Sequence, residues 1–174
     1  MLIRRETPTD SDVIRAVTTA AFARPEQPAQ AAPPEAGLID ELRSSPAWLA
    51  ALSLVATAPD GEVIGHVLCT RGQVGSTGVL GLGPISVRPD HQGRGVGSAL
   101  MHAVLGAADA LGEPLVALLG DPRFYQRFGF RLSTEYDIEP PLPEWRPHFQ
   151  VRVLTEYRGS VRGAFTYAAP FNAL

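Results

Sequence analysis

VRPDHQGRGVGSAL, residues 87–100, is the most informative segment of this chain. An apolar, strand-like run from Val79 to Val87 leads into a turn with three glycines at alternate positions, and a helix-forming sequence follows directly. Glycine allows a backbone to approach a bulky anion closely, and the free N–H groups at a helix start favour negative charge. Arg94, inside the turn, can add a charge-assisted hydrogen bond. The segment therefore predicts a cradle for a diphosphate group.

The turn also resembles the acyl-CoA signature of the GCN5-related N-acetyltransferase (GNAT) superfamily, Q/R-x-x-G-x-G/A. Gln92, Gly95 and Gly97 occupy its three fixed positions. Downstream, FYQRFGF at residues 124–130 resembles the Y-x-x-x-G-F segment of that family, and the gap between the motifs has room for one helix and one strand. The motif-bearing part spans about Val79 to Phe130. The chain as a whole is most similar to a predicted N-acetyltransferase subgroup that carries Gly-Asp-Pro before the tyrosine.

The composition is that of an ordinary globular domain. The 174 residues suggest one domain over residues 1–174, and a hydrophobic content of 45% is enough to form a core. A net charge of −3, with no cluster of Lys or Arg, argues against nucleic acid or an anionic membrane as a partner. Cys69 is the only cysteine, and the N-terminus has no apolar signal core. We expect a cytoplasmic protein without a disulfide or a membrane span.

Hydrophobic patterning and turn residues predict the elements of the fold. Strands are expected over Leu2–Arg5, Leu52–Ala58, Glu62–Arg71, Val79–Val87, Leu115–Leu119, Gln150–Thr155 and Ala164–Ala168. Helices are expected from Pro8-Thr9-Asp10 to Phe22, over Glu35–Ser44, from the glycines to Gly112, and over Pro122–Phe128. The helix after the glycines is expected to present one apolar face of Ala99, Leu100, Ala103, Val104, Ala107 and Leu111. The order indicates an α/β fold, a mixed central sheet with helices on both faces.

The resemblance adds a specific feature to this sheet. In the superfamily the two halves of the sheet splay apart after the strand that precedes the glycine turn. The resulting wedge takes the pantetheine arm of CoA, whose amides pair with the exposed strand edge. On this chain the edge would be Ile85, Ser86 and Val87. Pro84 removes a hydrogen-bond donor from the same strand, which costs little at a splayed edge.

The resemblance implies acetyl-CoA as co-substrate and no metal. The residues expected to bind it are Ile85, Ser86, Val87, Gln92, Gly93, Arg94, Gly95, Val96, Gly97, Ser98, Tyr125 and Phe128. Tyr125 lies where the family carries its general acid, which protonates the departing CoA thiolate. Judged from composition alone, Tyr125 would be an ordinary structural aromatic. The backbone N–H groups around Ser86 and Val87 would stabilise the thioester oxyanion.

The sequence does not identify the general base or the acceptor amine. Many superfamily members carry a Glu on the strand before the glycine turn, but Val79–Val87 contains no acid. The candidates are Glu35, Asp40, Glu41 and Asp121. An ordered water chain, or an amine that arrives already neutral, would need no dedicated base. The acceptor is a small-molecule or peptide amine, and a homodimer is possible. The acceptor pocket is expected to be lined by the loops Arg24–Pro34, Gly72–Gly78 and Glu139–Pro147. Trp48 and Trp145 are candidates for its walls. These loops carry few charges, which favours a small or apolar-bodied amine over a basic peptide tail.

Two other classes of protein compete with this interpretation. One is a nucleotide-binding Rossmann turn, which needs G-x-G-x-x-G/A directly after a strand. Here Ser98 ends the pattern and five residues separate it from the strand, although Asp121 lies roughly where a ribose-binding acid would be. The other is a CoA-binding module without catalysis, a sensor or an assembly partner. A zinc site is not expected, because the scattered histidines lack ligand spacing: His66, His91, His102 and His148.

Overall fold

The computed structural model describes residues 1–24 and 33–173. Its helices are α1 (Ser11–Phe22), α2 (Pro34–Arg43), α3 (Val96–Ala110) and α4 (Pro122–Tyr125). Its longer strands are β1 (Leu2–Arg5), β2 (Ser53–Thr57), β3 (Val63–Val74), β4 (Thr77–Val87), β5 (Leu115–Leu119), β8 (Phe149–Val153) and β9 (Gly163–Thr166). Two short strands, β6 (Arg131–Leu132) and β7 (Ile138–Glu139), complete the set within these ranges. No helix in the described ranges is long and apolar enough to cross a bilayer.

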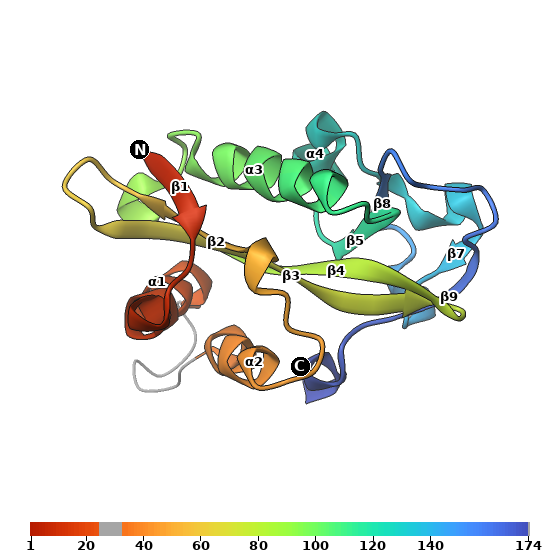
Figure 1. Ribbon diagram of the computed structural model, residues 1–174, viewed down its shortest axis with the longest axis horizontal. Coiled ribbons are helices and arrows are strands. Elements are labelled where there is room, and N and C mark those ends of the chain that lie inside the picture. The colour runs from red at the N-terminus through yellow and green to blue at the C-terminus, as the bar shows by residue number, and fades with distance from the viewer. Residues whose placement is uncertain (25–32, 174) are drawn as a thin grey trace.

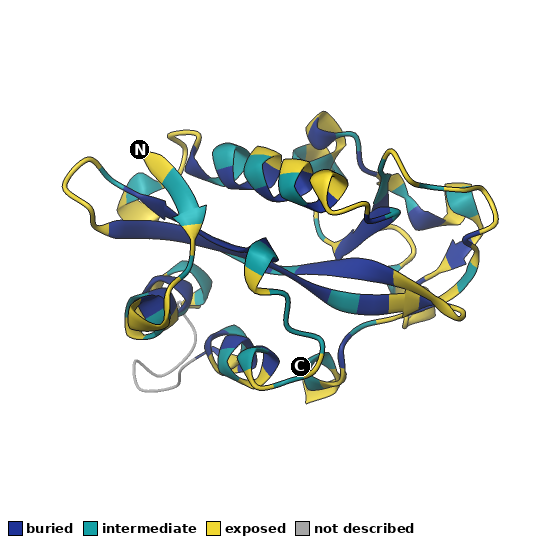
Figure 2. Ribbon diagram, in the orientation of Figure 1, coloured by how far each residue is buried: buried dark blue, intermediate teal, exposed yellow. Residues whose placement is uncertain are grey.

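The strands form one mixed sheet, as the sequence predicts. Their order is β1-β2-β3-β4-β5-β8-β6, with β9 beside β3 and β7 beside β9. The β4–β5 and β7–β9 pairs are parallel and the other pairs are antiparallel. Helices α1 and α2 cover one face of the sheet, and α3 and α4 cover the other (Figure 1). The strands between them are mostly buried, while the outer faces of the helices are exposed (Figure 2).

Each face of the sheet has its own apolar core. Leu100 and Val104 of α3 are fully buried against Val67, Leu80 and Val116 of the sheet. A second core is formed by residues of α1, α2 and the opposite side of the sheet, among them Ile14, Leu42, Val55 and Leu68. Truncating a buried leucine of this kind to alanine costs about 2–5 kcal/mol. The cores fix the helices on both sides of the strand that leads to the glycine turn.

The buried face of α3 is rotated relative to the prediction. Leu100 and Val104 are buried as expected, but the face continues through Val96, Met101, Leu105 and Ala108. The expected Ala99, Ala103 and Ala107 lie at its border, and Leu111 is exposed. The prediction was wrong because Val96, Met101 and Leu105 turn toward the core, where their larger side chains remove more apolar surface from water than the predicted alanines would.

Two predicted loops differ from the structure or lie outside it. Gly72–Gly78 is not a loop, because β3 and β4 continue to a tight hairpin at Gly75, whose φ of 57° suits glycine. Most of the predicted loop Arg24–Pro34 falls on residues 25–32, outside the described residues. The hairpin expected at Pro59-Asp60-Gly61 is confirmed, since Gly61 donates its N–H to Ala58 O at 2.9 Å.

The sheet splays between β4 and β5. These strands are paired at only two positions of the described structure, Leu80 with Val116 and Gly81 with Ala117. Beyond Gly81, β4 continues to Val87 while remaining paired with β3 on its other side. The last part of β4 therefore has an open edge. The predicted mixed sheet with a splay before the glycine turn is present.

Candidate active site

The glycine turn has the conformation that an anion cradle needs. Gly93 and Gly95 adopt φ values of 70° and 83°, a region that other residues rarely enter. A Cβ at either position would meet no other heavy atom within 4 Å, so both face open space. Helix α3 begins at Val96, and its first hydrogen bond runs from Ala99 N to Gly95 O at 2.9 Å. The N–H groups of Val96, Gly97 and Ser98 thus precede the helical ladder and lie at its positive end.

A cavity of about 490 Å³ lies over this turn. Nine of the residues expected to bind CoA line it: Ile85, Ser86, Val87, Gln92, Gly93, Gly95, Val96, Gly97 and Ser98. Its other walls come from α1, from α4 and the short 3-10 helix after it, and from the segment before the turn, namely Ala21, Phe22, Phe124, Arg127 and His91. The sequence analysis missed the α1 residues, since no motif marks them and only the packing of α1 beside β4 brings them near. We name this cavity the turn cavity.

Gln92 ties the turn to the splayed strand. Its side-chain Nε2 donates a hydrogen bond to Val87 O at 3.0 Å. On the opposite side of the same chain segment, Arg88 N donates a hydrogen bond to the backbone oxygen of Ile64 in β3 at 2.9 Å. Backbone groups of successive strand residues alternate in direction. The amides of Ile85 and Val87 therefore face the open edge of β4, whereas the amide of Ser86 faces β3.

This alternation corrects one part of the sequence analysis. Ser86 was expected to offer its backbone N–H to the thioester, but it pairs with His66 across the β3–β4 ladder. The Ser86 side chain is buried, and its Oγ lies 3.1 Å from Thr18 Oγ1 of α1. Ser86 therefore fastens α1 to β4. The donors directed at the open edge belong to Ile85 and Val87.

Three of the residues expected to bind CoA do not line the turn cavity, namely Phe128, Arg94 and Tyr125. Phe128 is 6% exposed and packs in the α3 core, with its ring edge-on to His102 and Phe124. Its position indicates a packing role, because a buried ring has no surface left for a ligand. Arg94 is exposed and does not line the cavity. Arg127, for which a phosphate contact was considered, lines the cavity and lies over the Phe124 ring at 4.9 Å.

Tyr125 is the last residue of α4, the short helix that follows the strand β5. Asp121 begins that helix by accepting a hydrogen bond from Arg123 N at 2.9 Å. Burial raises the pKa of the Tyr125 hydroxyl above its ordinary value. The hydroxyl is therefore protonated at neutral pH. Its ring packs edge-on against Phe124 and Phe130, which hold it in place.

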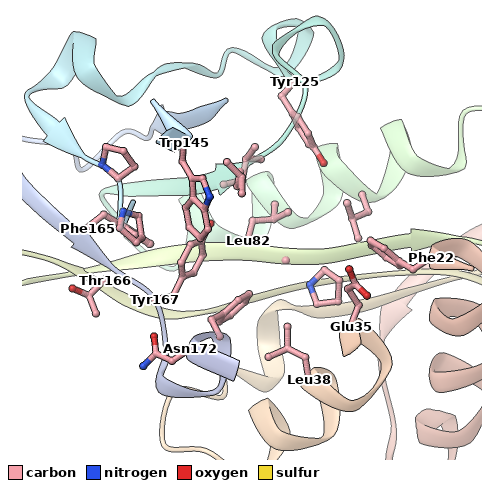
Figure 3. A pocket seen from close by; sticks show the side chains of 18 of the residues that line it. Phe22, Glu35, Leu38, Leu82, Tyr125, Trp145, Phe165, Thr166, Tyr167 and Asn172 are labelled. Carbon is pink, nitrogen blue, oxygen red and sulfur yellow. The ribbon is translucent and has the colours of Figure 1, made fainter. Parts of the chain in front are cut away.

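A larger cavity of about 710 Å³ adjoins the turn cavity. Tyr125 lines it, and Phe22 and Ile85 line both cavities. Figure 3 shows side chains from opposite layers directed at this space, with Tyr125 extending from α4 and Glu35 from α2. The other labelled walls include Leu82 and Trp145. We name it the inner cavity.

Glu35 is the one candidate base that the described structure places in the inner cavity. Its Oε2 is buried without a hydrogen-bond partner among the described residues. Asp40 instead forms ion pairs with Arg15 and Arg43. Asp121 caps α4 and pairs with Arg123, while Glu41 is exposed.

The expected acceptor walls are partly confirmed. Pro140, Pro141 and Trp145 of the predicted loop Glu139–Pro147 line the inner cavity, but nothing from Gly72–Gly78 does. Trp48 does not line it, because its ring packs beneath Arg43, with the guanidinium carbon 5.8 Å from the ring centroid.

Several aromatic walls come from the C-terminal segment, which the sequence analysis treated only as a closing strand. Tyr167 and Phe171 stack with ring centroids 4.5 Å apart and line the inner cavity beside Phe165. Tyr167 lies so close to Gly81 that a Cβ there would be 2.7 Å from its Cδ1. Only the antiparallel pairing of β9 with the end of β3 brings these rings to the splay.

His66, on the central strand β3, lies in the core. His66 is fully buried, within 2.8 Å of Ser53 Oγ and 3.2 Å of Glu6 Oε2, and burial lowers its pKa. It is a core residue, as expected. In the described ranges, no three His, Cys, Asp or Glu side chains are grouped to hold a metal ion.

Comparison with known proteins now assigns the family. Residues 19–130 match the model of the acetyltransferase (GNAT) family, and this range includes both the glycine turn and Tyr125. The chain belongs to this family. It is thus an acyl-CoA-dependent acetyltransferase, and the resemblance of its two motifs is confirmed.

Relatives extend the GNAT similarity over the whole chain. The N-acetyltransferase YhbS of Escherichia coli K12, itself named as uncharacterized, is 33% identical over 99% of both chains. A crystal structure of E. coli YhbS in complex with CoA has a TM-score of 0.86 at 31% identity, covering 98% of this chain and 91% of that one. A GNAT acetyltransferase from Brucella melitensis, solved with acetyl-CoA, has a TM-score of 0.78 at 35% identity, covering 98% and 97%.

Proposed function

We propose that this protein transfers the acetyl group of acetyl-CoA directly to a primary amine, with both substrates bound together. The observation that carries this proposal is the meeting of two cavities at Ile85 on the open edge of β4. The turn cavity lies over the glycine turn, and Tyr125 forms part of the wall of the inner cavity. The two GNAT relatives solved with CoA and acetyl-CoA support the choice of co-substrate.

The turn cavity would hold the diphosphate and the pantetheine arm. The N–H groups of Val96, Gly97 and Ser98 point toward a diphosphate without needing a side chain. The cationic side chain of Arg127 lines the same cavity and adds charge. From there the arm would run along the open edge of β4, where the amides of Ile85 and Val87 offer hydrogen bonds. The thioester then lies beside the inner cavity and Tyr125.

The chemistry follows from this placement. A neutral amine attacks the thioester carbonyl, the C–N bond forms, and an N–H group at the β4 edge stabilises the oxyanion. Collapse of the intermediate breaks the C–S bond, and the Tyr125 hydroxyl protonates the departing thiolate. The proton lost by the new amide nitrogen restores Tyr125. Holding both reactants in adjoining cavities supplies much of the rate by removing the entropy of their encounter.

A panel of amines with acetyl-CoA and a thiol-detecting reagent tests the function. We expect thiol release that depends on an amine and yields the N-acetylated product by mass spectrometry. Calorimetry with CoA alone is run beside it. Tight CoA binding without amine-dependent thiol release would instead support the non-catalytic CoA-binding module, and preferential binding of NADH would favour a nucleotide site.

A further inference from the structure

We propose that the acceptor is a cationic primary amine on an apolar, uncharged body, without a carboxylate, and that Glu35 binds its ammonium group. This inference rests on the proposed function and specifies its acceptor. It comes from the chemistry of the inner cavity. In the part of the chain that the structure describes, the lining has an extended apolar wall and one carboxylate, and it contains no cationic side chain.

The wall of the inner cavity is largely aromatic and aliphatic. Trp145, Phe165, Tyr167 and Phe171 line it, the last three from the C-terminal segment. Such a surface binds apolar rings and chains by removing them from water, at about 25 cal/mol per Å² of apolar surface. A flexible polar body would gain little there. The acceptor therefore carries an apolar body of substantial size.

Glu35 supplies the negative charge of this cavity. It lies in the first turn of α2 and lines the wall opposite α4 (Figure 3). Its buried Oε2 lacks a hydrogen-bond partner among the described residues, although a buried polar atom is normally satisfied. An ammonium group donates three hydrogen bonds and a positive charge. The acceptor would thus complete the bonding of Glu35 while lying near the reacting thioester. Its nitrogen becomes the neutral nucleophile only after it has lost one proton to solvent.

The lack of a cationic side chain in the described lining disfavours acceptors that carry a second charge besides the reacting amine. No Arg, Lys or His lines the inner cavity in the described ranges, and the sequence of residues 25–32, PEQPAQAA, contains none of these residues. A free amino acid would bring its carboxylate into an apolar space that already holds Glu35, without a partner for the new charge. A diamine would place its second ammonium where the described lining offers no second carboxylate, and cation–π contacts with the aromatic rings would offset only part of its desolvation. Both should be poor acceptors.

Four acceptors test the class: 2-phenylethylamine, L-phenylalanine, L-phenylalaninamide and 1,5-diaminopentane. We expect kcat/KM for 2-phenylethylamine to exceed the values for phenylalanine and the diamine by about tenfold or more, since an unpaired buried charge is costly. The amide should recover most of the activity lost with phenylalanine. Calorimetry of each amine with the protein saturated in CoA should rank their affinities in the same order.

Glu35→Gln tests the anchor, and Glu41→Gln on the exposed side of the same helix is its control. Because a hydrogen bond to a charged group contributes substantially, Glu35→Gln should raise KM for 2-phenylethylamine about 10- to 100-fold. KM for acetyl-CoA should stay within about twofold, since Glu35 does not line the turn cavity. Glu41→Gln should leave both constants unchanged.

The outcomes separate this inference from the proposed function. Preferred acetylation of phenylalanine or the diamine, or an unchanged amine KM in Glu35→Gln, would overturn the acceptor class while leaving the acetyltransferase intact. If CoA binds but none of the four amines binds or reacts, the acceptor class is overturned as well. Failure to bind CoA in calorimetry would overturn the proposed function itself.

Discussion

The ring of Tyr125 lies directly on the backbone of Gly120. A Cβ at position 120 would be 2.9 Å from Tyr125 Cδ2, and the Cε2 atom is nearer still. No residue other than glycine fits there without moving the ring. Gly120 thus positions the proposed general acid, although it touches no substrate itself.

Gly120→Ala should move the Tyr125 ring and lower kcat by about tenfold or more, because small displacements of a catalytic group are costly. CoA affinity should change little, since Gly120 does not line the turn cavity. Steady-state kinetics and calorimetry measure both. The matched control is Gly106→Ala on the exposed side of α3, where a Cβ meets nothing within 4 Å. Equal kcat values in the two variants would remove the positioning role of Gly120.

Tyr125→Phe removes the hydroxyl and keeps the ring packing. General acid catalysis contributes about 10²- to 10⁴-fold, so with water as a partial substitute we expect kcat to fall by at least about tenfold. Burial raises the pKa of Tyr125, so the wild-type hydroxyl stays protonated through the neutral range and its contribution is lost only as pH rises through the raised pKa. That alkaline limb of the kcat profile should vanish in the variant. A wild-type kcat with chemistry rate-limiting would leave Tyr125 as a wall of the cavity.

Gly95→Val should abolish CoA binding. The new side chain would project into the open space over the turn, where the diphosphate is proposed to lie. The positive φ also carries a backbone cost of about 1–2 kcal/mol or more. Gly61→Val, at a φ of 89° in the β2–β3 hairpin and also without neighbours, imposes similar strain away from the cavity. Calorimetry should show CoA binding in the Gly61 variant alone, and equal binding in both would contradict the cradle.

Glu6→Gln should destabilise the protein in a pH-dependent way. Burial by itself raises the pKa of Glu6, but hydrogen bonds from His66, Arg43 and Ser53 outweigh it and lower the pKa to about 2. Since the unfolded carboxyl titrates near 4.5, the ionised form stabilises the fold above that pH, and the contribution is lost as pH falls from about 4.5 to about 2. The Tm difference between wild type and variant should be largest near neutral pH and shrink through this window. A constant difference down to pH 2 would contradict the linkage.

Local features of the chain were predictable because they depend on neighbouring residues. The glycine spacing before α3, the hairpin at Gly61 and the start of α4 at Asp121 all follow from backbone conformations that only certain residues adopt. Longer-range features were not. The extended β3–β4 hairpin replaced a predicted loop because pairing over many residues outweighs the weak strand propensity of glycine.

The amino-acid sequence by itself determined the mixed sheet, the glycine turn before α3 and the position of Tyr125 after β5. Only the tertiary structure decided which acid reaches the inner cavity: Asp40 and Asp121 pair with arginines, whereas Glu35 lines the cavity and its Oε2 has no partner among the described residues. It also decided that the β4 edge offers Ile85 and Val87 rather than Ser86. The physical reason is the same in each case. Turns are set by consecutive residues, whereas partners, strand faces and cavity walls are set by contacts between segments far apart in the chain.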